Sequence, residues 1–444
     1  MATESLAPVA AITDLILGTL TIILANRAVN HDPHKRFTAL LFGWTFIFIG
    51  AYYMIISVIE LRYPDGVFGW SLIQFGTFAP TGDGTFDALV FILYGLQAGI
   101  NILTLALALH LPFDLGSGRG WNAAIIGGVG VYAIIMPIVV IFGGFSITVI
   151  QSFMIFATSA IWTMIYIRGI VAELIDGDQE ARSASKGAGL LLIAFYSGTM
   201  IWWLSTIMLA NNEWFSGVIS QMSESSSIFY LLGVETLWVA GLMPLVVLFL
   251  GEGYRTFKKG ASLLSVVIFV VAVIGFINYF IDIAVSDILV SCYETECREL
   301  PAAYRVWETL TTGVLSYLFV PLLFVYILIQ YRLIDTSSDE NRNLLRIMIL
   351  LLLLIVSSSF IEMIQSLIPV PQMVTASLLA IAVAFFGWEE RITGWFVEES
   401  ADGETVFGDN ILAQSFSKFT VLMSVVLVYI IAISWLFAAM GVGA

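Results

Sequence analysis

The chain has 444 residues, of which 59% are hydrophobic and only 11% are charged, and its mean hydropathy is +0.96. This composition excludes an ordinary soluble globular domain and predicts a protein of the lipid bilayer. The formal net charge of -15 argues against nucleic acid as a partner, because a nucleic-acid-binding protein needs a basic face.

About a dozen segments reach the length of roughly 20 apolar residues that a helix needs to cross a hydrocarbon core. The first five lie within residues 7–172, near 7–27, 38–60, 87–110, 122–142 and 145–172. The others lie near 188–210, 229–251, 261–285, 307–333, 346–368, 372–388 and 419–441. They predict an all-α fold, a polytopic transmembrane helix bundle of about 12 spans in a single integral membrane domain, 1–444.

Two stretches of the chain resemble each other closely enough to suggest a duplicated helix. Each begins with Glu-Thr-Leu, contains Pro-Leu and ends with Tyr-Arg, from Glu235 to Arg255 and from Glu308 to Arg332. We expect repeated helix hairpins at 188–251, 261–333 and 346–388. Their rising helices, and an earlier one like them, contain small residues that predict close helix packing, among them Gly50, Gly198 and Gly275.

The basic residues predict the orientation, because loops rich in Lys and Arg stay on the cytoplasmic side. With the amino terminus outside, all 18 Lys and Arg residues except Arg62, Arg298 and Arg305 fall on the cytoplasmic side. We therefore expect a multi-pass protein of the cell membrane with both termini outside.

Acidic residues within the predicted spans are the candidate functional residues, because ionisable groups are costly in a membrane and usually face a cavity, a partner or a pathway. They gather in the outer half of their spans and predict an outward-facing acidic vestibule. The candidate cation site comprises Glu235, Asp282, Glu362, Asn278, Gln365, Glu308 and Asp14. A simpler interpretation also stays open, in which carboxylates close to helix ends reach the lipid headgroups.

The two cysteines, Cys292 and Cys297, lie in a loop that we expect outside, and we predict a disulfide between them. His31 and His34 flank Asp32 and Pro33 in a predicted cytoplasmic loop. We interpret these histidines as solvated loop side chains and expect no metal site.

The sequence contains neither a phosphate-binding GxxxxGK[ST] loop nor an HExxH zinc helix, so no nucleotide site is visible, any cofactor stays unknown, and an enzyme is not favoured. Among the remaining functions, the sequence favours a transporter or channel subunit for a cation or small solute. A membrane sensor that acts through a separate partner and a non-catalytic scaffold subunit are the alternatives. Residues 389–418 form the longest predicted cytoplasmic segment and the candidate surface for a membrane or cytoplasmic protein partner.

Overall fold

The computed structural model describes residues 7–27, 32–62, 83–112, 147–209, 228–294 and 320–334, with scattered positions from 127 to 134 and from 341 to 352. These residues form helices joined by short turns, and no strand occurs among them. The all-α prediction is confirmed for this part of the chain. The predicted spans at 372–388 and 419–441 and the predicted partner surface at 389–418 lie outside the described residues.

Within the described residues, six helical segments are long and apolar enough to cross a membrane, which supports a bilayer as the surroundings of this chain. They are Ala10–Arg27, Pro33–Ile59, Gly84–His110, Met154–Ile175, Gln179–Ile201 and Leu263–Ile281. Each coincides with a span predicted from the sequence. The count of about 12 spans stays a prediction.

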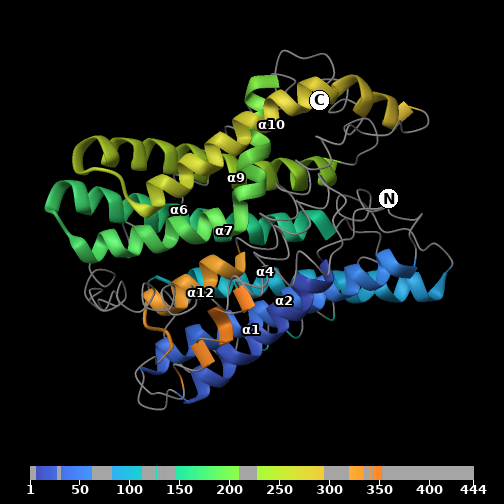
Figure 1. The fold of residues 1–444 in the computed structure, drawn as a ribbon, viewed down its shortest axis with the longest axis horizontal. Helices are drawn as coiled ribbons and strands as arrows, with labels where there is room; N and C mark the ends of the chain where they lie inside the picture. Colours follow the sequence, from blue (N-terminus) through green and yellow to red (C-terminus); the bar gives the residue numbers. More distant parts are fainter. Residues whose placement is uncertain are drawn as a thin grey trace, which may run out of the picture. The chain divides into compact units, whose positions relative to one another are not determined.

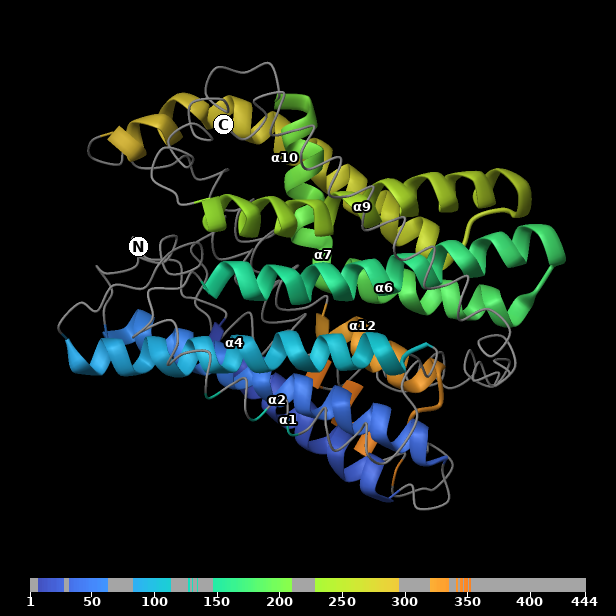
Figure 2. The same ribbon diagram turned by 180° about the vertical axis from the view of Figure 1, so that it is seen from behind.

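The first compact unit comprises Met1–Phe145 and Val306–Phe407. Its described helices are α1 (Ala7–Arg27), α2 (Pro33–Arg62), α4 (Gly84–His110) and α12 (Val320–Gln330), and α2 packs against the other three. Figures 1 and 2 show α1 and α2 side by side from two directions. They approach closely because glycine lies at the crossing: a Cβ on Gly18 would stand 2.7 Å from the Gly43 carbonyl oxygen.

The second compact unit comprises Ser146–Arg305 and Gly408–Ala444. Its described helices are α6 (Ile147–Asp176), α7 (Gln179–Leu209), α9 (Ile228–Lys259) and α10 (Leu263–Glu294). α6 packs on α7 and α9, and α7 also packs on α10 (Figure 1). Trp162 of α6 is fully buried and stacks on Phe195 of α7 with ring centroids 5.6 Å apart, so aromatic packing fixes the two helices side by side.

Two turns in the second unit are much shorter than the sequence predicted. We expected cytoplasmic loops from 172 to 188 and from 251 to 261, but the helices continue through most of these residues and leave only Gly177–Asp178 and 260–262 between them. Gly177 has φ +71° and Gly260 has φ +88°, a left-handed conformation that glycine adopts without steric cost. Asp178 then caps α7 by accepting hydrogen bonds from the backbone N–H groups of Glu180 and Ala181.

The two stretches interpreted as a duplicated helix end differently. Tyr254 and Arg255 lie inside α9, which continues to Lys259, whereas Tyr331 and Arg332 form a turn after α12, with Arg332 at φ +49°. The Glu308 end of the second copy lies outside the described residues. The internal repeats therefore stay a prediction.

The small residues singled out in the sequence have different surroundings. A Cβ on Gly50 would stand 2.8 Å from the Leu15 backbone nitrogen, and one on Gly275 would stand 2.7 Å from the Leu204 Cβ. Close helix packing is therefore confirmed at these two glycines. At Gly198, an added Cβ would meet no described atom within 4 Å, so among the described residues close packing is not seen there.

Candidate functional site

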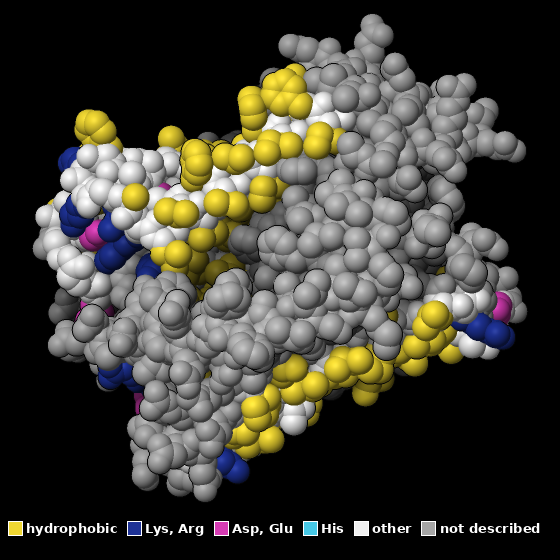
Figure 3. Space-filling view, in the orientation of Figure 1, with side chains coloured by type: hydrophobic (Ala, Val, Ile, Leu, Met, Phe, Trp, Pro, Cys, Tyr) yellow, Lys and Arg dark blue, Asp and Glu magenta, His cyan; other side chains and the backbone are white. Residues whose placement is uncertain are grey.

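The best-defined group of charged side chains lies beside the two short turns of the second unit. We call it the charged cluster. Its members come from all four described helices of that unit and from one of the turns: Glu173, Arg182, Glu252, Arg255, Lys259, Ser262 and Ser265. In Figure 3 basic and acidic side chains gather at the end of the second unit where these turns lie.

Arg182 of α7 and Glu252 of α9 form the centre of the charged cluster. Arg182 Nη1 donates to Glu252 Oε1 at 2.6 Å, and Nη2 donates to Oε2 at 3.3 Å. The side chains are only 9% and 2% exposed, so the pair is shielded from water. This two-pronged geometry is the strongest that an arginine and a carboxylate make.

Three hydroxyl groups complete the surroundings of Glu252. Ser262 and Ser265 donate to its Oε2 at 2.9 and 2.8 Å, and Tyr166 of α6 donates to its Oε1 at 3.3 Å. Burial alone would raise the pKa of the Glu252 carboxyl, but the hydrogen bonds and charge of Arg182, with the two serine hydrogen bonds, outweigh burial and lower it below its ordinary value. Glu252 lies just past the apolar stretch 229–251 and stays ionised at neutral pH.

Glu173 of α6 is the second acid of the charged cluster. Arg255 Nε donates to both of its carboxylate oxygens at 3.3 Å, and Lys259 Nζ lies 3.5 Å from one of them. Arg182 Nε lies 3.5 Å from the other, so Arg182 links the two acids. Because the acids are fully occupied by donors, the arrangement joins helix ends and leaves no carboxylate free for acid–base chemistry.

The charged cluster does not follow from the sequence as long as Arg182, Arg255 and Lys259 are interpreted only as markers of cytoplasmic loops. The sequence nevertheless contains a signal for these ion pairs. Glu173 and Glu252 lie at the predicted cytoplasmic ends of their spans, whereas the acids chosen as candidates lie at the opposite ends. Acids beside basic residues at a membrane edge predict ion pairs better than solvated loops.

Asp14 is the one candidate carboxylate whose side chain the structure describes. It lies in α1, in the first compact unit, and is 1% exposed. Neither carboxylate oxygen has a hydrogen-bond partner among the described residues. A buried carboxylate in this condition needs a proton, a cation or a polar ligand to compensate for its lost hydration.

The other candidates are not brought together by the described residues. Asn278 is half-buried on α10, and α10 also contains Asp282 one turn later, as the spacing predicted. Glu235 lies in α9, but the side chains of Glu235 and Asp282 are not described. Glu308, Glu362 and Gln365 lie outside the described residues, so the shared vestibule stays a prediction.

The predicted disulfide also stays untested. Cys292 lies in the last turn of α10, which ends at Glu294, and Cys297 lies outside the described residues.

The interpretation of His34 as a solvated loop residue is wrong. His34 lies in the first turn of α2, where its Nε2 donates to the carbonyl oxygen of His110 at 3.0 Å. The rings of His34 and His110 are 5.4 Å apart. Helix α2 begins earlier than the predicted span at 38 because Pro33 suits the first helical position. His31 lies outside the described residues, and no group of three or more possible metal-ligating side chains occurs among the described ones.

Comparisons with protein-family models, with curated proteins and with solved structures found no match to this chain.

Proposed function

We propose that this protein is a multi-pass membrane transporter or channel subunit for a cation or a protonatable small solute, and that Asp14 binds the proton or the cation. The observation that supports the proposal is the Asp14 carboxylate, which is buried in an apolar helix and has no hydrogen-bond partner among the described residues. An isolated buried charge is too costly to serve packing alone.

The surroundings of Asp14 favour an exchanging group over a permanent ion pair. Asp14 lies seven residues after the start of α1, and the basic residue in the last turn of that helix is Arg27, 13 positions further along. On a helix that rises 1.5 Å per residue, this separation is about 20 Å. Within α1, therefore, no basic side chain is close enough to neutralise Asp14, and a mobile cation or proton can take that role.

The orientation belongs to the same proposal. With the amino terminus outside, Asp14 lies in the outer half of its span, and we infer that it is reached from the outer solution. A cation that reaches Asp14 favours the charged carboxylate, whereas a proton neutralises it, so the two compete for Asp14. This competition couples proton movement to cation movement.

The proposal is tested by measuring flux through the full chain in liposomes. The dye pyranine inside the vesicles reports internal pH while a sodium or potassium gradient is imposed. We expect cation-driven proton movement with the wild type. Asp14→Asn should lower its rate by at least about tenfold, equivalent to ~1.4 kcal/mol of lost interaction.

Asp87→Asn is the matched control, because Asp87 is an acid in the first turn of α4, where the helix end already favours negative charge. This variant should retain the wild-type rate. The proposal would be contradicted if Asp14→Asn had the wild-type rate or if both variants lost the same share of it. It would also be contradicted if neither gradient drove proton movement in the wild type.

The sensor and scaffold alternatives remain predictions from the sequence. The segment on which a partner was expected to dock, 389–418, lies outside the described residues.

A further inference from the structure

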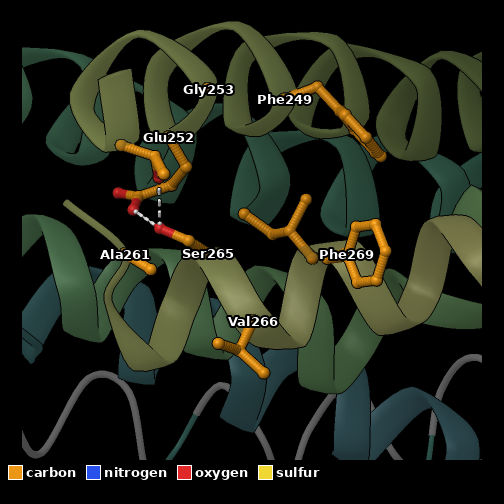
Figure 4. Close-up of a pocket in the computed structure, with 9 residues that line it drawn as sticks. Phe249, Glu252, Gly253, Ala261, Ser265, Val266 and Phe269 are labelled. Atoms are coloured by element: carbon orange, nitrogen blue, oxygen red, sulfur yellow. Dashed lines mark hydrogen bonds between the residues drawn. The ribbon is translucent and has the colours of Figure 1, made fainter. Parts of the chain in front are cut away.

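A groove runs between α9 and α10 next to the charged cluster. Its volume is ≈ 390 Å³, which lies within the range of pockets that hold small molecules. Figure 4 shows α9 as one wall, with Phe249, Glu252 and Gly253, and α10 as the other, with Ser265 and Phe269. All lining residues belong to the second compact unit.

The groove changes from apolar to polar along its length. Phe249, Ile268 and Phe269 line one end, and Glu252, Thr256 and Ser265 line the other. At the polar end Thr256 donates to the Ser265 Oγ at 2.9 Å, and Ser265 donates to Glu252. An occupant that fits both ends has an apolar chain joined to a polar group.

The apolar end of the groove continues into a face of α10 that is suited to lipid. Phe269 is 67% exposed, and exposed apolar side chains recur along the helix at Val273, Phe276 and Phe280. They lie within the apolar segment Leu263–Ile281, and hydrophobic side chains cover this face in Figure 3. A helix that exposes such a face in a membrane protein contacts acyl chains.

The polar end lies at the level expected for lipid headgroups. Tyr254 and Phe257 are 51% and 89% exposed near the end of α9, and Lys258 Nζ lies 4.8 Å above the Tyr254 ring. Exposed aromatic and basic side chains are typical of the interface between hydrocarbon and water. The polarity of the groove therefore runs in the same direction as the polarity of a membrane phospholipid.

We propose that the groove between α9 and α10 binds one membrane phospholipid, with an acyl chain between Phe249 and Phe269 and the ester region beside Thr256 and Ser265. Phe249 and Ile268 also face Ile193 and Met200 of α7, where the remaining space is too small for a water molecule, so the acyl chain stays between α9 and α10. This proposal does not depend on the transport proposal, because Asp14 lies in the other compact unit.

Gly253 offers a direct way to fill the groove. It lines the groove, and a Cβ at this position would meet no atom of the described residues within 4 Å. Gly253→Leu therefore places a side chain in the space of the acyl chain without a clash at its Cβ. Leucine also has a higher helix propensity than glycine, so the variant should fold. Gly198→Leu is the matched control, since a Cβ on Gly198 also meets no described atom within 4 Å, but Gly198 lies on α7, outside the groove.

The experiment is native mass spectrometry of the full chain, stripped of lipid in detergent and titrated with dioleoyl phosphatidylglycerol. We expect wild type and Gly198→Leu to bind one lipid tightly. The affinity of Gly253→Leu for this first lipid should be at least about tenfold lower. Free glycerol phosphate should not compete, because the groove holds the chain. Unchanged affinity of Gly253→Leu, an equal loss in both variants, or displacement by glycerol phosphate would overturn the proposal.

Discussion

Glu252 and Asp14 show two different ways in which this chain buries a carboxylate. Glu252 accepts hydrogen bonds from Arg182, Tyr166, Ser262 and Ser265, so its charge is compensated within the protein. Asp14 is equally buried but has no such partner among the described residues. The first arrangement stabilises the folded chain, whereas the second leaves a buried carboxylate whose lost hydration no described residue compensates.

The depressed pKa of Glu252 predicts a loss of stability in acid. Because its pKa is lower in the folded state than the ordinary value of 4.5, the stabilisation is present above that value and is lost as pH falls through the folded pKa. We expect the melting temperature of the wild type in detergent to fall below about pH 4.5. Glu252→Gln should have a lower melting temperature than the wild type at neutral pH. Below pH 4.5 its melting temperature should fall less, because it lacks the Glu252 carboxyl and only the carboxylates common to both proteins still titrate. Parallel curves for the two proteins over this range would show that Glu252 does not contribute the effect.

At the scale of the helices, the charged cluster joins the ends of α6, α7, α9 and α10. Arg182 is the member that contacts both acids, so it determines whether the cluster holds together. Removing one partner of a buried ion pair is more damaging than removing both, because the remaining charge stays buried and unpaired.

Arg182→Met should therefore destabilise the protein by about 3–5 kcal/mol, the usual effect of breaking a buried ion pair. Hydrogen–deuterium exchange should increase at the first turn of α7 and at the turn between α9 and α10, where Ser262 donates to Glu252. Lys258→Met is the control, because Lys258 is exposed and contacts the Tyr254 ring. If both variants exchange alike, the charged cluster does not hold these helix ends.

The sequence predicts the apolar parts of these helices well and their ends poorly. A count of apolar residues places the start of one span at 188, whereas α7 begins at Gln179. The difference arises because a helix continues through charged residues when their side chains find partners, as Arg182 does with Glu252. Arg182 and Glu252 are 70 positions apart in the chain. A local pattern of hydrophobicity cannot predict that two such distant residues form a pair.

At the scale of the whole molecule, the sequence predicts which residues are chemically unusual but not which ones meet. The position of Asp14 in the outer half of its span follows from the sequence, whereas the burial of its side chain is seen only in the structure. Whether several acids share one cavity depends on how helices pack, and glycines at crossings such as Gly18 and Gly43 control that packing through distances that a sequence does not contain.

The proposed exchange of a proton for a cation at Asp14 is tested most directly by carbodiimide labelling. Dicyclohexylcarbodiimide modifies protonated carboxyl groups in apolar surroundings, and peptide mass spectrometry locates the modified residue in the full chain in liposomes. We predict modification of Asp14 that decreases as sodium or potassium is raised, because a bound cation favours the charged form. Asp87, at the end of α4, should show no such protection. Absence of modification at Asp14, or modification that neither cation reduces, would contradict the account.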